Sequence, residues 1–183
     1  MNDTLKTIME RYSCRDFTDT PLSDTEIQAL VEAAVASPSA HNRQPWHIIV
    51  IRDKSLINDM DDDGMKILSA AEDRSVYERF MSRGGKLFYN APCMFMVASD
   101  RSDYAIVDCG ILTQNISLAA HSLGLGNVIC GMARIPLSGS RADEFMKRMK
   151  FPSGYEFGMA VLVGNAKSVK EPHELDFTKV TYI

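Results

Sequence analysis

The longest helical pattern in the chain, over residues 103–123, restricts the possible folds more than any other segment. Apolar residues lie on one helical face of this segment and also on its other faces. A helix that is apolar nearly all round must be covered on more than one side. In a domain of only 183 residues, we expect a second copy of the chain to provide part of that cover. The apolar positions are Ala105, Cys109, Leu112, Ile116, Ala119 and Leu123 on one face, and Ile106, Ile111 and Leu118 on others.

Shorter apolar segments between turn residues predict a sheet covered by helices. The segment at 92–99 is typical of a strand buried on both faces. A helix start is marked by the capping box of Ser23 and Glu26. The alternation of elements predicts an α/β (α+β) fold, as a single domain over residues 1–183. The predicted strands are 46–52, 92–99, 127–131 and 156–163, the further helices are 3–11, 23–36 and 139–149, and 178–183 is an extended tail.

Residues 53–90 are polar and mixed in character. They predict short helices and a mobile surface excursion. Their acidic run, from Asp59 to Asp63, lacks the spaced ligands and the distal Glu of an EF-hand. We therefore expect this run to be a solvated surface rather than a cation site.

Charge and hydropathy narrow the class of protein. The net charge is −4 and the basic residues are scattered, which favours neither a nucleic acid nor a membrane surface as partner. The first residues lack the features of a signal peptide, and no apolar run approaches the length of a membrane span. We expect a cytoplasmic protein whose partners are small molecules or a second copy of itself.

The four cysteines, Cys14, Cys93, Cys109 and Cys130, lie far apart in the sequence. No C-x-x-C pair occurs, which disfavours zinc and thioredoxin-type chemistry. We expect each cysteine to be reduced and to act as a small buried hydrophobic residue.

A polar loop at residues 37–46 precedes the first predicted strand. Pro38 and Pro45 keep it from continuing a helix, and the short polar residues between them present hydrogen-bonding groups. It predicts a rigid loop that holds a polar group, although a plain connection from helix to strand has the same features.

A second polar patch lies near the N-terminus, where Arg11 and Arg15 bracket Ser13. Two guanidinium groups and a hydroxyl suit a phosphate, which accepts charged and often bidentate hydrogen bonds. The alternative interpretation is two exposed arginines near a helix end. Elsewhere the chain has no G-x-G-x-x-G, P-loop, G-x-S-x-G or metal-ligand spacing, which disfavours dinucleotide domains of the Rossmann type, acyl transfer and metal hydrolysis.

Together these motifs resemble the nitroreductase family of FMN-dependent oxidoreductases. The resemblance rests on Arg11-x-Ser13-x-Arg15-x-Phe17 followed by Pro38-Ser39-x-x-Asn42-x-Gln44-Pro45-Trp46. It extends from about residue 8 to the end of the chain, through Ala91-Pro92, Asp108-x-Gly110, Gln114-Asn115, Leu123-Gly124-Leu125-Gly126 and Gly164. Residues 53–85 have no clear counterpart in the larger members of the family.

The resemblance implies a fold and an assembly. The fold is nitroreductase-like, with a central mixed sheet flanked by helices, in an intertwined homodimer. The loop that contains Pro38, Ser39, Ala40 and Asn42 would pack on the flavin of the other subunit. The FMN site would therefore exist only in the homodimer.

The resemblance also implies roles for residues around the cofactor. Arg11, Ser13 and the backbone of Tyr12 would hold the phosphate and ribityl end of FMN, and Arg15 would reach the pyrimidine edge. Lys86 would lie near flavin N1 and O2, where a positive charge favours reduction. The turn of Gly131 and Met132 would approach N5 through a backbone N–H, and Lys167 and Lys170 would contact the phosphate.

The activity that the resemblance implies is hydride transfer from NADH or NADPH, through flavin N5, to a small nitroaromatic, quinone or enone, in a ping-pong cycle. Because a flavin supplies the redox chemistry, no acid and base pair is needed in the sequence. Two alternatives stay open. One is an FMN-binding module for storage or redox sensing without turnover, and the other is an interaction domain without a cofactor.

Overall fold

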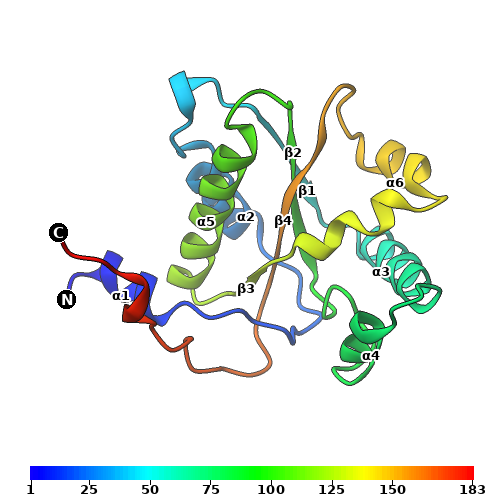
Figure 1. Cartoon of the computed structure of the whole chain (residues 1–183), viewed down its shortest axis with the longest axis horizontal. Helices are drawn as coiled ribbons and strands as arrows, with labels where there is room; N and C mark the ends of the chain where they lie inside the picture. The colour runs from blue at the N-terminus through cyan, green and yellow to red at the C-terminus, as the bar shows by residue number, and fades with distance from the viewer.

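The computed structural model describes residues 1–183 and has one four-stranded sheet at its centre (Figure 1). The strands are β1 (Trp46–Ile51), β2 (Cys93–Ser99), β3 (Gly126–Ile129) and β4 (Glu156–Gly164), in the order β1-β2-β4-β3. The helices are α1 (Asp3–Glu10), α2 (Asp24–Val35), α3 (Lys54–Ser69), α4 (Ser75–Met81), α5 (Ala105–Ser122) and α6 (Ala142–Met149), with short 3-10 turns η1 (Ala40–Asn42), η2 (Gly131–Arg134), η3 (Pro136–Ser138) and η4 (Phe177–Lys179).

Every pair of neighbouring strands is antiparallel, so the expectation of a mixed sheet is wrong for the chain itself. Hydrophobic patterns locate strands but do not fix their direction. Here each connection is long enough for the next strand to run in either direction beside its neighbour. The alternation of strands and helices, which is common in parallel sheets, therefore does not determine the pairing.

Helices cover both faces of the sheet (Figure 1). Alternate residues of β2 point to opposite sides, as a pleated strand requires. Phe95 and Val97 pack in one core with α2 and α5, whereas Met94 and Met96 pack in a second core with α3, α4 and α6. All of β2 is buried, which confirms the predicted strand with two covered faces.

The N-terminus of α2 confirms the predicted capping box. Ser23 Oγ accepts a hydrogen bond from the backbone N–H of Glu26 at 3.2 Å, and the Glu26 carboxylate accepts one from the backbone N–H of Ser23 at 2.7 Å. Both bonds satisfy donors that a helix start leaves unpaired. The boundaries of this helix were therefore readable from the sequence.

The prediction of short helices and a solvated acidic run within 53–90 is wrong for α3. This helix has 16 residues, and Asp61 and Asp63 are buried in it beside Met60 and Gly64. Gly64 lies so close to Leu87 that a Cβ there would be 2.6 Å from that side chain. The buried face of α3 was not recognised in the sequence because it contains these two carboxylates, and Asp is rarely buried without partners.

The exposed side of α5 remains uncovered in a single chain. Ile106, Val107 and Ile111 are 59%, 55% and 37% exposed, whereas Cys109, Leu112 and Ile116 are buried against the sheet. The prediction that one chain cannot cover this helix on all sides is thus consistent with the structure. No helix is long and apolar enough to span a bilayer.

All four cysteines are free and buried, as predicted. Burial raises the pKa of the Cys93 thiol to about 12, and those of Cys109 and Cys130 to about 11. These thiols stay protonated at neutral pH, and a protonated thiol is a poor nucleophile.

Three segments cross where β3 begins. The backbone N–H of Cys14 donates to Asn127 O at 2.8 Å, and the N–H of Lys167 donates to Asp16 O at 3.0 Å. The segment around Cys14 thus lies between β3 and the chain that follows β4. A Cβ at Gly126 would lie 2.9 Å from Cys14 Sγ and 3.0 Å from the Cβ of Ala166, so only glycine fits this crossing.

Gly126→Ala tests this close packing. We expect a loss of about 1–3 kcal/mol in the free energy of unfolding, because the added methyl group overpacks the space between the side chains of Cys14 and Ala166. Urea denaturation at one fixed protein concentration measures it. Ser55→Ala, in the first turn of α3, removes an exposed hydroxyl and should change stability by less than about 0.5 kcal/mol. Equal stability of the two variants would contradict the close packing.

Candidate functional site

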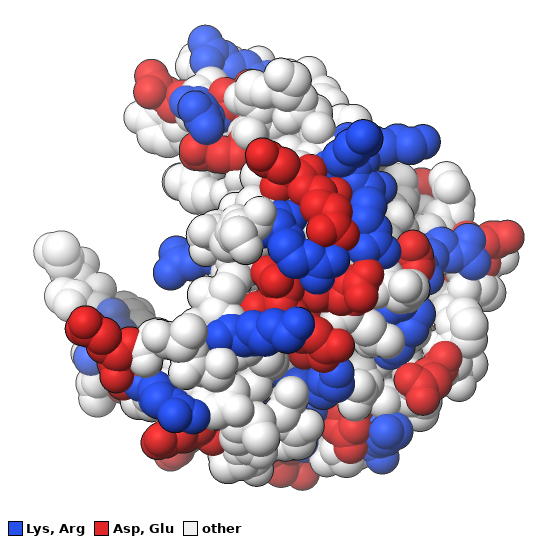
Figure 2. All heavy atoms as spheres, turned by 90° about the vertical axis from the view of Figure 1, so that its right-hand side faces the viewer, with Lys and Arg blue, Asp and Glu red and all other residues white.

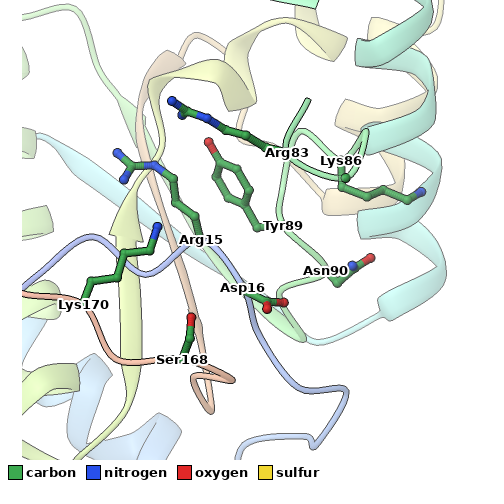
Figure 3. A pocket seen from close by; sticks show the side chains of 9 residues that line it. Arg15, Asp16, Arg83, Lys86, Tyr89, Asn90, Ser168 and Lys170 are labelled. Atoms are coloured by element: carbon green, nitrogen blue, oxygen red, sulfur yellow. The ribbon is translucent and has the colours of Figure 1, made fainter. Parts of the chain in front are cut away.

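The candidate site is a cleft beside this crossing, made of two adjoining cavities of about 570 and 320 Å³. Arg15, Arg83 and Tyr89 line both, so the two cavities are neighbours, and Figure 3 shows the side chains around the larger of them. The larger part is also lined by Lys86, Asn90, Ser168 and Lys170, and the smaller part by Arg79, Cys130, Gly131 and Met132. Both volumes are within or near the range of small-molecule sites.

Basic side chains outnumber acidic ones on the wall of the larger cavity. Arg15, Arg83, Lys86 and Lys170 contribute four cations, and Asp16 is the one carboxylate. Asp16 Oδ1 lies 3.6 Å from Lys167 Nζ, a fifth cation nearby. On the face of the molecule in Figure 2, basic and acidic side chains are interspersed. An anionic small molecule suits the larger cavity best.

Backbone hydrogen bonds bring the N-terminal motif and the tail together. Besides the crossing at Cys14, the N–H of Thr18 donates to Asn165 O at 2.8 Å. Tyr12 Oη donates to Ser168 O at 3.4 Å. Arg15 and Lys170, which are 155 positions apart in the sequence, therefore line the same cavity. Arg11, Ser13 and Lys167 lie on the same two segments but do not line it.

A buried carboxylate fixes the turn on the other side of the cleft. Asp61 accepts hydrogen bonds from the backbone N–H groups of Leu87 at 3.1 Å and Phe88 at 2.7 Å. The next two residues, Tyr89 and Asn90, have positive φ angles of 54° and 60°, a conformation that costs energy for residues other than glycine. This turn forms one wall of the cavity and is held by Asp61 of α3, a residue predicted to be solvated.

Lys86 lies at the rim of the cavity, but its ammonium group points elsewhere. Lys86 Nζ is 2.9 Å from Asp62 Oδ1 of α3, and this hydrogen bond raises the pKa of Lys86. In Figure 3 the Lys86 side chain is turned toward α3, away from Arg15 and Tyr89, while Arg83 extends toward them. Its role near N1, implied by the resemblance, stays a prediction.

Gly131 and Met132 open η2, directly after β3, and line the smaller cavity. The structure thus ends β3 at Ile129, two residues before the predicted end of the strand, and turns the chain at Gly131. A Cβ at Gly131 would meet only Met159 Sδ, at 3.8 Å, so the backbone of this turn borders open space.

The loop at 37–46 is held by hydrogen bonds, but it is not in this cleft. Both carboxylate oxygens of Asp108 accept a hydrogen bond from the backbone N–H of Ala40 at 3.2 Å, and Ser39 Oγ accepts one from the N–H of Gln44 at 2.9 Å. His41 and Asn42 have positive φ angles of 54° and 53°. Pro38, Ser39, Ala40 and Asn42 line neither cavity.

The two motifs lie at opposite ends of α5 (Figure 1). Ala40 is bonded to Asp108 in the first turn, and the Tyr12 ring packs edge-on against His121 in the last turn, with 6.4 Å between ring centres. Asp108 and His121 are 13 positions apart on the helix. At a rise of 1.5 Å per residue, this corresponds to about 20 Å. Within one chain the motifs therefore do not share a cavity.

Several residues of the cleft had no signal in the sequence analysis. Arg79 and Arg83 belong to α4 and the turn after it, within residues 53–85, where no site residue was predicted from the sequence, and Tyr89 and Asn90 follow shortly after. The glycines at 84 and 85, with φ angles of 97° and 67°, were the one available signal of a sharp turn there.

Comparisons with known proteins agree with this geometry. The chain matches the sequence model of the Nitroreductase family over residues 8–165. A protein of Archaeoglobus fulgidus, provisionally named an NADH dehydrogenase/NAD(P)H nitroreductase, is 31% identical over 186 residues, which is 96% of this chain and 92% of that protein.

Two solved structures are similar over the whole chain. A nitroreductase with bound FMN from Desulfitobacterium hafniense is 52% identical, with a TM-score of 0.97, and the alignment covers 100% of this chain and 99% of that one. An FMN-dependent nitroreductase from Clostridium difficile is 28% identical, with a TM-score of 0.83 and coverage of 100% and 99%.

The buried carboxylate of Asp61 predicts a pH dependence of stability. Burial raises its pKa above the usual value of 3.8, and the N–H groups of Phe88 and Leu87 oppose this rise. A raised pKa means that stability present below pH 3.8 is lost as the pH rises through the folded-state pKa. Asn does not ionise, so the stability of Asp61→Asn relative to wild type should increase between acid and neutral pH.

Asp59→Asn is the matched control, on the same helix. A hydrogen bond from Arg148 lowers the pKa of Asp59, so its contribution to stability is present above the usual pKa and lost as the pH falls. The stability of this variant relative to wild type should therefore decrease toward neutral pH. Urea unfolding across the acid range measures both, and parallel curves for the two variants would contradict the assignment.

Proposed function

Because the chain belongs to the nitroreductase family, we propose that it is an FMN-dependent oxidoreductase that uses NADH or NADPH as its electron donor. The acceptor is a small electrophile such as a nitroaromatic, a quinone or an enone. When bound, FMN supplies the redox chemistry, because its N5 atom accepts a hydride from the nicotinamide and donates it to the acceptor. Sharing one flavin and one pocket, the two substrates react in turn in a ping-pong cycle.

The observation that carries this proposal is the cationic cleft. Its wall carries three cations without an ion-pair partner, Arg15, Arg83 and Lys170, which fit a ligand with a phosphate group and an electron-poor ring. The relative with 52% identity has FMN bound in its structure, which supports FMN as the ligand of this cleft. No histidine lines the cleft, so it offers no general base of the usual kind and suits chemistry that a cofactor supplies.

The proposed contacts follow the two sides of the cleft. Lys170, which lines the larger cavity, holds the phosphate and ribityl end together with Arg11, Ser13, the Tyr12 backbone and Lys167, which lie on the two segments beside the cavity. Arg15 lies at the pyrimidine edge, and the backbone of Gly131 and Met132 approaches N5. Burial raises the pKa of the Tyr89 phenol, and Arg15 offsets part of this rise, so Tyr89 remains a neutral hydrogen-bonding group in the cleft.

The complete site requires a homodimer. The loop of Pro38, Ser39, Ala40 and Asn42 lies about 20 Å from the N-terminal motif along α5, so it reaches a cleft only in another copy of the chain. The exposed apolar residues of α5, Ile106, Val107 and Ile111, provide a surface for that contact. Each flavin would then lie between the cationic cleft of one subunit and the loop of the other.

The direct test is to load the purified protein with FMN and assay it under anaerobic conditions. We expect a flavin spectrum, bleaching by NADH or NADPH, and recovery on addition of a quinone or nitroaromatic. Initial rates at several acceptor concentrations should give parallel double-reciprocal lines. A protein that takes up no FMN would contradict the proposal. Bound FMN that no nicotinamide reduces would favour the storage or sensing module instead.

Mixed dimers test whether two chains build each site. Arg15→Ala removes a cation of the cleft, and Asn42→Gly removes the loop amide while tolerating the positive φ angle. In a dimer with one copy of each variant, one site receives both defects and the other receives none. We expect one FMN per mixed dimer at wild-type affinity, by equilibrium dialysis. If each site belonged to one chain, every site would carry one defect and none would bind like wild type.

A further inference from the structure

We infer that Arg83, rather than Lys86, is the residue that sets the reduction potential of the bound flavin, acting with Arg15 across Tyr89. The inference rests on the proposed function, since it concerns how the cleft treats bound FMN. It assigns a role to the turn after α4, where no site residue was predicted from the sequence.

The first support is where the two side chains lie. Arg83 lines both cavities of the cleft, whereas Lys86 lines only the larger one. In Figure 3 Arg83 and Arg15 extend on either side of the Tyr89 ring, toward its hydroxyl end, and Lys86 extends the opposite way to α3. The ring portion of a ligand that contacts Gly131 and Met132 in the smaller cavity is next to Arg83, which also lines that cavity.

The second support is the pairing of the charges. Lys86 is neutralised by Asp62 at 2.9 Å, and Asp61 lies close enough to add a further negative charge. Arg83 forms no ion pair and no side-chain hydrogen bond with the protein. The field of a paired cation is largely cancelled at a distance, whereas the field of an unpaired cation is not. Arg83 therefore contributes more positive potential to the cleft than Lys86 does.

The third support is the anchoring of the Arg83 backbone. The N–H groups of Arg83 and Gly85 both donate to Phe80 O, at 2.9 and 3.0 Å, which ends α4 in a tight turn. The buried Phe80 ring packs against Tyr89, with 5.9 Å between ring centres. The base of the Arg83 side chain is thus fixed relative to Tyr89, even though its guanidinium is exposed before a ligand binds.

The consequence follows from the charge of the flavin. Two-electron reduction gives FMN a negative charge on its pyrimidine side that the oxidised form lacks. An unpaired cation beside that side binds the reduced form more tightly than the oxidised form, and it thereby raises the reduction potential. A ligand that covers the cleft excludes water and strengthens this effect.

The test compares Arg83→Gln with Lys86→Gln in the FMN-loaded protein. Both changes remove one positive charge and keep a long polar side chain. For Arg83→Gln we expect the affinity for reduced FMN to fall about tenfold more than that for oxidised FMN, which lowers the two-electron midpoint potential by about 30 mV. For Lys86→Gln we expect less than a twofold difference between the two forms. Arg83→Lys should recover most of the effect.

Arg74→Gln controls for net charge, because Arg74 stacks on Tyr77 and lines neither cavity. It should leave the potential unchanged. An unchanged potential in Arg83→Gln, or a shift in Lys86→Gln alone, would overturn the inference while leaving the flavin assignment intact. Wild-type protein that binds no FMN would overturn this inference and the proposed function together.

Discussion

The rigid length of α5 is the constraint on which the arrangement of the site depends. At one end of the helix, the Asp108 carboxylate accepts hydrogen bonds from the Ala40 N–H and so holds the polar loop. The other end contacts the N-terminal motif at Tyr12. A helix cannot shorten to bring these motifs together, so a cofactor that needs both must be bound by two chains. The same helix leaves an apolar face exposed, and this is the surface that a second chain would cover.

The electrostatics of the cleft depend on which cations already have partners. Lys86 and Lys167 are committed to Asp62 and Asp16, whereas Arg15, Arg83 and Lys170 form no ion pair. A count of basic residues would treat all five alike. Pairing divides them into cations that a carboxylate already neutralises in part and cations without a partner, and the second kind adds most to the potential in the cleft.

Much of the fold could be predicted from the sequence, because its main elements carry strong local signals. The capping box placed α2, apolar runs placed the four strands, and the apolar pattern of residues 103–123 predicted α5. The direction of the strands was not predictable, since pairing depends on connections that carry no pattern of their own. The inner face of α3 was missed because Asp61 and Asp63 interrupt it, and Asp61 satisfies the distant N–H groups of Leu87 and Phe88.

The candidate site was predicted in outline through the resemblance of its motifs to the nitroreductase family. Arg15, Gly131, Met132 and Lys170 were selected from the sequence, and the structure brings them to one cleft. Arg83 and Tyr89 were not, because Tyr89 follows a turn held by the distant Asp61, and the place of Arg83 depends on the packing of Phe80 against Tyr89. The direction of the Lys86 side chain was equally unpredictable, since it depends on Asp62 one helix away.

The central claim, that one flavin is held between two chains, is tested most directly by sedimentation of the FMN-loaded protein with detection in the visible flavin band. Dilution through the dissociation range of the dimer separates the two possibilities. Flavin absorbance should sediment only with a species of twice the chain mass and should be released as that species dissociates. Flavin that sediments with a single chain would contradict this claim.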